Sequence, residues 1–168
     1  NEPTVSGANN VGGIVGSIAS SGGYVQNCSV NANIAASGNY AGSIVGKTEQ
    51  PADGKKIEIT GGCYFSSSCT VSAADYAGGI VGNGASMNVG AASFTGDVSG
   101  TKDDTAYVGG IAGKTPTAAA AGGYNYVIRN CGNFGKIVSI SDLPEPTDGT
   151  TNAVTNGAGG IAGYFGKW

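Results

Sequence analysis

The chain has 168 residues, a length that suits one domain, and its 32 glycines do not fall at every third position, which excludes collagen. Its hydrophobic content of 40% argues against a disordered linker, and no apolar run approaches the roughly 20 residues of a membrane span, so membrane insertion is not expected. Because the formal net charge is −3 and Lys and Arg never cluster, nucleic acid is not an expected partner either.

A five-residue glycine motif returns five times along the chain. It has the sequence GGIVG, GSIVG or GGIAG and occupies residues 12–16, 42–46, 78–82, 109–113 and 159–163. Its first glycines are therefore 30, 36, 31 and 50 residues apart. Three copies carry a tyrosine two residues before the first glycine: Tyr40, Tyr76 and Tyr107. Such self-similarity indicates stacked structural units of about thirty residues, some of them with insertions.

A second landmark lies between successive glycine motifs. Segments 25–34, 60–69, 90–98 and 128–137 align without gaps on a first column of small residues: Cys28, Cys63, Ala92 and Cys131. Six residues later comes a second column of larger side chains: Ile34, Cys69, Val98 and Ile137. Because an even separation keeps two positions on one face of an extended strand, the two columns predict two interior layers.

Each unit is expected to contain three extended pieces: a strand around the glycine motif, a strand through the Cys column, and a piece that leads to the next motif. Helix signals do not recur, and an interior Gly costs a helix about 1 kcal/mol relative to Ala. Coils that stack in register form a parallel β-helix, whereas a β-sandwich would show non-repeating strands every ~8–12 residues. We therefore expect an all-β parallel β-helix or β-solenoid of four to five coils with inserted loops. It should form a single domain over residues 1–168, as a fragment of a longer chain.

The surroundings of the glycine motif and the insertions are less regular. Both faces of the motif are apolar, so we expect cover on both sides, with a loop of the same coil over the outward face. Which face points to the core stays open. The insertions at 49–56, 117–126 and 140–157 are expected in surface loops, where extra length is entropically cheap. These loops are either specialised contact sites or insertions without a specialised role.

The glycine motif, followed at a distance by an Asn-Cys step, resembles the GLUG motif repeat of bacterial secreted and surface proteins. All five motifs carry the resemblance, as do Asn27-Cys28 and Asn130-Cys131, whereas Gly62-Cys63 keeps only the Cys and Ala91-Ala92 keeps neither. The match covers nearly the whole chain apart from the inserted loops. The resemblance implies a non-catalytic module of large adhesins, or of surface-anchored peptidases that cleave host immunoglobulins. It implies extracellular display and host contact, and it assigns no catalytic residue.

The residue types restrict the chemistry further. The sequence contains no His, which excludes Ser-His-Asp, Cys-His and His-metal sites. The four cysteines are buried free thiols, contain one disulfide, or form a metal or redox site. Cys63 and Cys69 should lie roughly 20 Å apart along one strand, too far for a disulfide, while Cys28 and Cys63 on neighbouring coils are within reach in an awkward orientation. We expect no cofactor and no metal.

Two features could nevertheless carry carbohydrate or cation chemistry. Asp103 and Asp104, together with Asp97, offer oxygen ligands for Ca²⁺ but lack a fixed ligand spacing. The tyrosines at 40, 76 and 107 should stack as a partial ladder, with Asn10 and Gly157 in the outer units. The ladder either fixes the register of the coils or forms a platform for sugar rings.

These observations predict a non-catalytic structural or adhesive module that displays loops to a host protein or glycan. Only 11% of the residues are charged, and a coat of Ser, Thr, Asn and Gly is common in extracellular repeat proteins, so we expect an extracellular or bacterial cell-surface location. One alternative is a carbohydrate-active or carbohydrate-binding β-helix that uses Tyr40, Tyr76 and Tyr107 as ligand-binding residues. Another is a self-assembling extracellular filament subunit, since open solenoid ends expose unpaired strand edges and permit end-to-end self-association.

Overall fold

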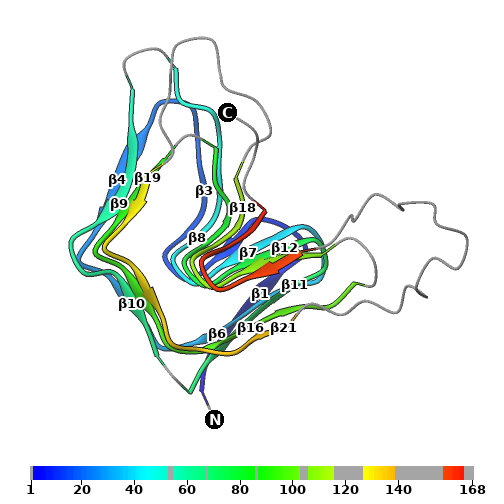
Figure 1. Ribbon diagram of the computed structural model, residues 1–168. Coiled ribbons are helices and arrows are strands. Elements are labelled where there is room, and N and C mark those ends of the chain that lie inside the picture. The colour runs from blue at the N-terminus through cyan, green and yellow to red at the C-terminus, as the bar shows by residue number, and fades with distance from the viewer. Residues whose placement is uncertain are drawn as a thin grey trace, which may run out of the picture.

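The computed structural model describes residues 2–52, 55–66, 68–85, 87–102, 106–115, 127–138 and 157–164. Within these ranges the chain forms 23 β-strands and no helix. The strands make five sheets, and their pairings are parallel. Figure 1 shows the chain winding repeatedly around one axis, so the predicted all-β parallel β-helix is confirmed.

Each full coil consists of five strands rather than the three extended pieces that we expected. The first coil holds β1 (Thr4–Gly7), β2 (Val11–Gly12), β3 (Val15–Ile18), β4 (Gly23–Gln26) and β5 (Ser29–Val30). The second holds β6 (Asn33–Ala36), β7 (Tyr40–Gly42), β8 (Val45–Thr48), β9 (Ile57–Thr60) and β10 (Tyr64–Phe65). The third holds β11 (Thr70–Ala73), β12 (Tyr76–Gly78), β13 (Val81–Asn83), β14 (Asn88–Gly90) and β15 (Ser93–Phe94). The fourth holds β16 (Asp97–Gly100), β17 (Tyr107–Gly109), β18 (Ala112–Lys114), β19 (Val127–Arg129) and β20 (Gly132–Asn133). The fifth holds β21 (Ile137–Val138), β22 (Gly157–Gly159) and β23 (Ala162–Tyr164).

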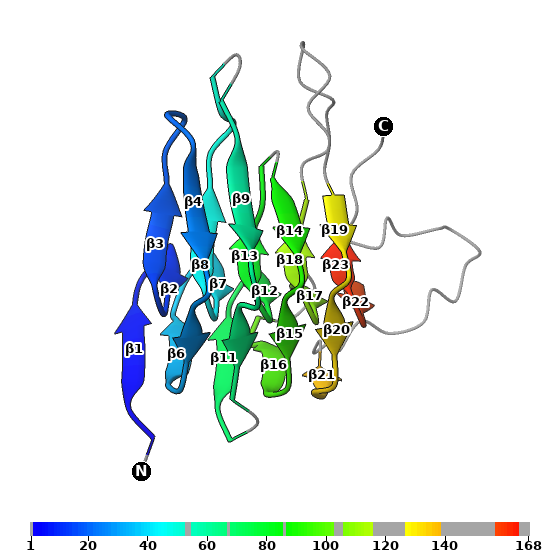
Figure 2. The same cartoon turned by 90° about the vertical axis from the view of Figure 1, so that its left-hand side faces the viewer.

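Equivalent strands of successive coils lie side by side, as Figure 2 shows from the side of the stack. The five sheets have the orders β1-β6-β11-β16-β21, β2-β7-β12-β17-β22, β3-β8-β13-β18-β23, β4-β9-β14-β19 and β5-β10-β15-β20. Because the strands of one sheet are about 4.8 Å apart, any position of the repeat recurs along the axis at that spacing.

The cross-section of the coil is bent, which Figure 1 shows in the view along the axis. The sheets of β3 and β4 form one arm, and the sheets of β1 and β2 form the other. The sheet of β5 closes the outer corner, and the glycine motif turns the chain at the inner corner. The two halves of the motif therefore face each other across the inner angle of the coil.

The glycine motif is a bend between two strands and not a single strand, which corrects our expectation. β7 ends at Gly42 and β8 begins at Val45. The reason is steric: a Cβ on Gly42 would lie 2.6 Å from the backbone N of Gly82, and one on Gly46 would lie 2.6 Å from the backbone N of Val11. Only glycine allows backbones to approach so closely. The glycine face is thus covered by the other half of the motif and not by a loop of the same coil.

The isoleucine at the third position of the motif settles which side is interior. Ile44, Ile80 and Ile111 in the three middle coils are completely buried, whereas Ile14 and Ile161 in the first and fifth coils are 45% and 41% exposed. The bend therefore directs this side chain into the core, where each middle copy is covered by the coils on either side.

The first predicted interior column is confirmed, and one member of the second is wrong. Cys28, Cys63, Ala92 and Cys131 precede strands that pair one-to-one, so they lie in single file. In the second column, however, Val71 and not Cys69 pairs with Ile34 and Val98. The second coil has two extra residues between β10 and β11, which place Cys69 in the turn, where its N–H donates to Ser66 O at 3.3 Å. All four cysteines are free; Cys63 and Cys69 are buried, and Cys28 and Cys131 are half-buried.

The residue before the first column has a left-handed backbone, which explains the Asn of the Asn-Cys step. Asn27 and Asn130 have φ of 54° and 53°, and the second coil uses Gly62 with φ of 84°. Asn and Gly tolerate this conformation better than other residues. The third coil places Ala91 there with φ of 52°, and this is a strained position for alanine.

Candidate functional site

The tyrosines before the glycine motif form the predicted ladder along one sheet. Tyr76 pairs in register with Tyr40 and with Tyr107. The ring centroids of Tyr40 and Tyr76 are 5.1 Å apart with an interplanar angle of 19°, and those of Tyr76 and Tyr107 are 5.7 Å apart at 3°. Gly157 continues this position in the fifth coil, and Asn10 precedes β2 in the first. We call the three stacked rings the Tyr ladder.

The rings of the Tyr ladder cover one another's faces. Near-parallel rings at these centroid distances can only be stacked along the axis, so Tyr40 and Tyr107 cover the two faces of Tyr76. The three tyrosines are half-buried. A sugar platform needs a free ring face, and stacking covers both faces of Tyr76. The geometry therefore favours a structural role for this ring, with each ring pair worth about 0.5–1.5 kcal/mol. Direct sugar stacking on Tyr40, Tyr76 and Tyr107 stays a prediction.

A second column of side chains follows directly after each glycine motif. Its members pair in register on the sheet of β3, and we call it the post-glycine column: Ser17, Lys47, Asn83, Lys114 and Tyr164. Because the motif folds the chain back on itself, this column lies next to the Tyr ladder.

Contacts between the two columns are close. The Lys114 ammonium group is 4.8 Å from the ring centroid of Tyr76 and 3.5 Å from its hydroxyl oxygen. The same group lies 5.7 Å from the centroid of Tyr107 and 5.8 Å from that of Tyr164. Tyr164 meets Tyr107 edge to face, with centroids 5.0 Å apart and an angle of 65°. These distances are within the range of cation–π attraction, so the rings hold the Lys114 amine in place.

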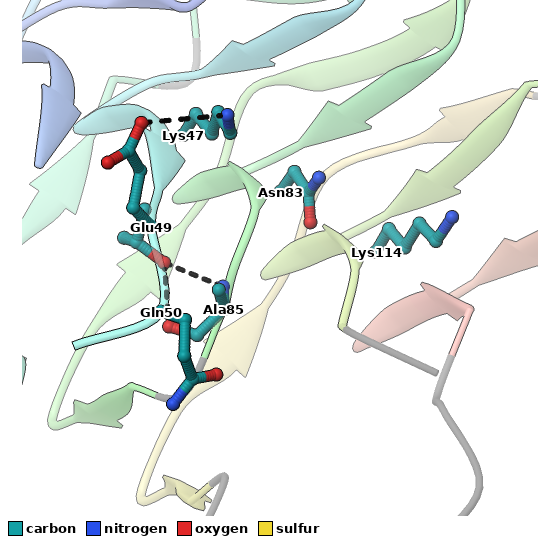
Figure 3. Close-up of a pocket in the computed structure, with 7 residues that line it drawn as sticks. Lys47, Glu49, Gln50, Asn83, Ala85 and Lys114 are labelled. Atoms are coloured by element: carbon teal, nitrogen blue, oxygen red, sulfur yellow. Dashed lines mark hydrogen bonds and ion pairs between the residues drawn. The ribbon is translucent and has the colours of Figure 1, made fainter. Parts of the chain in front are cut away.

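A shallow hollow of about 330 Å³ lies along the post-glycine column, and Figure 3 shows its lining. Lys47, Asn83 and Lys114 follow one another across β8, β13 and β18. The rest of the lining comes from the ends of these strands and the segments after them: Thr48, Glu49, Gln50 and Ala85. The Thr48 hydroxyl accepts from the Ala85 N–H at 2.7 Å, which ties the floor of the hollow across two coils.

The hollow has an excess of positive charge. The Lys47 amine lies 3.9 Å from a Glu49 carboxylate oxygen, with both side chains partly exposed, so this ion pair is weak. Among the described residues, Lys114 has no carboxylate within ion-pair distance, since the remaining ion pair joins Lys102 to Asp75. A half-buried ammonium without a counter-ion, beside amide and hydroxyl groups, suits an anionic group of a ligand.

The post-glycine column was missed at the sequence level although the sequence contains a signal for it. Each member is the residue immediately after a glycine motif, seven positions beyond the residue of the Tyr ladder in the same coil. On a straight strand, two positions seven residues apart point to opposite faces. Because the glycine motif bends the chain between them, these two positions come together instead, and the sequence does not reveal the bend.

The other predicted chemistry is not assembled by the described residues. Burial raises the pKa of the Cys63 thiol above its ordinary 9.0, so this thiol stays protonated and unreactive. Asp97 is exposed and accepts from the Lys136 N–H at 3.1 Å, while Asp103 and Asp104 lie outside the described residues. The insertions at 117–126 and 140–157 fall almost entirely outside them as well. The described part of the chain contains no group of three His, Cys, Asp or Glu side chains that could hold a metal ion.

Comparison of the chain with family models, curated proteins and solved structures found no match. The resemblance to GLUG repeats therefore stays a prediction. In the described ranges no helix is long and apolar enough to cross a membrane.

Proposed function

We propose that this chain is a non-catalytic structural and adhesive module of an extracellular or bacterial cell-surface protein. The coils act as a stiff frame that holds turns and side-chain columns at fixed spacing for contact with a host protein or glycan. The polar, weakly charged composition and the resemblance to GLUG repeats support this role.

The observation that carries the proposal is the unbroken register of the five sheets. Ile34, Val71 and Val98 pair in one row and are completely buried, and the other sheets repeat the same order. Such a stack buries a continuous core, so its outer positions can vary without loss of the frame. The Tyr ladder and the post-glycine column are both built on this frame.

The test is adhesion without turnover. Beads coated with the purified chain are applied to arrays of host-cell glycans and extracellular host proteins, and supernatants over each bound ligand are assayed for released product. We expect retention of beads that is lost after heat unfolding, and no product. Beads that bind no array member better than heat-unfolded chain would refute the adhesive role.

A carbohydrate-active β-helix is the second candidate, favoured by the hollow beside the Tyr ladder. It predicts release of reducing ends from a glycan that the chain binds. Release that is abolished in the double variant Asp103→Asn/Asp104→Asn, with binding retained, would establish this candidate in place of the non-catalytic module.

A further inference from the structure

The hollow along the post-glycine column combines three properties that together define a ligand class. It presents two ammonium groups, those of Lys47 and Lys114, on strands that are separated by one strand. Between them lies the amide of Asn83, which can donate and accept hydrogen bonds. The hollow runs along the axis of the stack, across three successive coils.

We call this hollow the groove, and we propose that it binds an acidic polysaccharide with a carboxylate on alternate sugars, oriented along the axis of the coils. Lys47 and Lys114 bind successive carboxylates, and Asn83 binds hydroxyl or amide groups of the sugar between them. This inference rests on the function proposed above and names the ligand class of that contact module.

The spacing of the strands that carry the two lysines favours this class of polymer. Two strand spacings place the backbones of Lys47 and Lys114 roughly 10 Å apart along the axis, a distance that matches the length of an extended disaccharide unit. Side chains on one face of an extended acidic peptide repeat at about 7 Å, because they are two residues of about 3.4 Å apart. Charges along one strand of a DNA duplex repeat at about 3.4 Å. Neither of these polymers has successive charges at a spacing that equals the spacing of the two lysine positions.

The Tyr ladder contributes by positioning Lys114 and not by stacking on the sugar. The rings of Tyr76 and Tyr107 lie 4.8 Å and 5.7 Å from the Lys114 ammonium group, and the Tyr76 hydroxyl is 3.5 Å from it. The electron-rich rings keep the amine near the groove without neutralising its charge. A ligand carboxylate then supplies the counter-charge that no described side chain supplies.

The experiment measures binding of the chain to a hyaluronan octasaccharide by calorimetry. The double variant Lys47→Met/Lys114→Met keeps the aliphatic stems and removes both charges. We expect it to weaken the dissociation constant by about tenfold or more, as loss of charged hydrogen bonds does. The matched control, Lys56→Met/Lys136→Met, lowers the net charge by the same two units at exposed positions outside the groove and should leave affinity unchanged. Circular dichroism and thermal unfolding verify that both variants are folded, and Lys47→Arg/Lys114→Arg, which keeps both charges, should retain binding.

Three comparisons decide the outcome. A neutral chitin oligosaccharide of equal length and a poly-glutamate peptide should bind at least about tenfold more weakly than hyaluronan, and hyaluronan affinity should fall as salt rises. Equal binding of poly-glutamate, equal loss in the control variant, or no hyaluronan binding by the native chain would each overturn the proposal. In these cases retention of beads on the host arrays would still support the adhesive module, so the two failures are distinguishable.

Discussion

Replacing Gly78 by Ala should destabilise the fold far more than an ordinary Gly-to-Ala change. A Cβ at this position would lie 2.6 Å from the backbone N of Gly113 in the next coil and closer still to Val81 O in its own coil. Real Cβ atoms essentially never come within 3.0 Å of such atoms, so the bend and the next coil must both move. Because these neighbours belong to the backbone, no rotamer change can relieve the overlap.

The size of the effect follows from two opposing terms. Overpacking costs about 1–3 kcal/mol, and rigid backbone neighbours place this site near the upper limit. The unfolded chain loses entropy when Ala replaces Gly, which returns about 0.4–1 kcal/mol. We expect the free energy of unfolding to fall by about 2–2.6 kcal/mol. For a chain of this length that lowers Tm by roughly 5–10 °C.

The measurement is urea and thermal unfolding followed by circular dichroism, with Gly90→Ala as the matched control. A Cβ on Gly90 would lie 3.6 Å from Arg129 Nε and from Thr60 Cγ2, which is ordinary contact. Gly90→Ala should therefore be neutral or stabilising by up to about 1 kcal/mol. If Gly78→Ala unfolds within about 0.5 kcal/mol of the native chain, close backbone approach is not what requires glycine in the motif.

Four further experiments test other parts of the fold. Ala91→Asn should stabilise the chain by about 0.5–1 kcal/mol, because Asn relieves the left-handed strain at an exposed position; lower stability in urea would contradict this. Tyr76→Leu removes two ring pairs and should cost about 1–3 kcal/mol, and an unchanged Tm would show that the ladder is not stabilising. Burial raises the Cys63 pKa above 9.0, so its stabilising contribution is complete below pH 9.0 and is lost as pH rises through the folded-state pKa. Stability should accordingly fall in alkali less steeply for Cys63→Ala than for the native chain. Thiol reagents at pH 8 should modify half-buried Cys131 before Cys63, and the reverse order would contradict the burial.

Periodicity in the sequence was sufficient to predict the stacking of equivalent positions. The file of Cys28, Cys63, Ala92 and Cys131 and the ladder through Tyr76 follow from the repeat alone, because parallel in-register pairing brings equal positions together. The alignment failed at Cys69, where two extra residues are absorbed by a turn. The sequence alignment was based on the number of residues between positions, whereas the register of the strands is set by hydrogen bonds. An insertion in a turn therefore changes the residue spacing and leaves the strand register unchanged.

The direction of the chain within a coil could not be predicted in the same way. An apolar GGIVG segment is compatible with a flat strand, and the sharp bend at Ile80 depends on backbone contacts with the next coil. Without the bend, nothing in the sequence relates Lys114 to Tyr76, since they lie 38 residues apart and on different coils. The repeat pattern therefore did not predict the candidate groove, although the Tyr ladder and the post-glycine column each recur with the repeat.

The glycine motif links the frame to the proposed ligand contact. In every coil the position two residues before the motif and the position directly after it are brought to the same inner angle: Asn10 and Ser17, Tyr40 and Lys47, Tyr76 and Asn83, Tyr107 and Lys114, Gly157 and Tyr164. The glycines fix the angle, and these two positions are free to differ from coil to coil.

In the fifth coil the ladder position is Gly157 and the aromatic residue, Tyr164, lies in the post-glycine column. Tyr164 meets Tyr107 edge to face and does not extend the stack. Because the cation is present in only two of the five coils, the charge pattern along the axis is not a consequence of the repeat. It is a property added to the repeat, and this is the physical reason to look for ligand selectivity in the post-glycine column and not in the glycines or the buried Ile, Val and Cys positions.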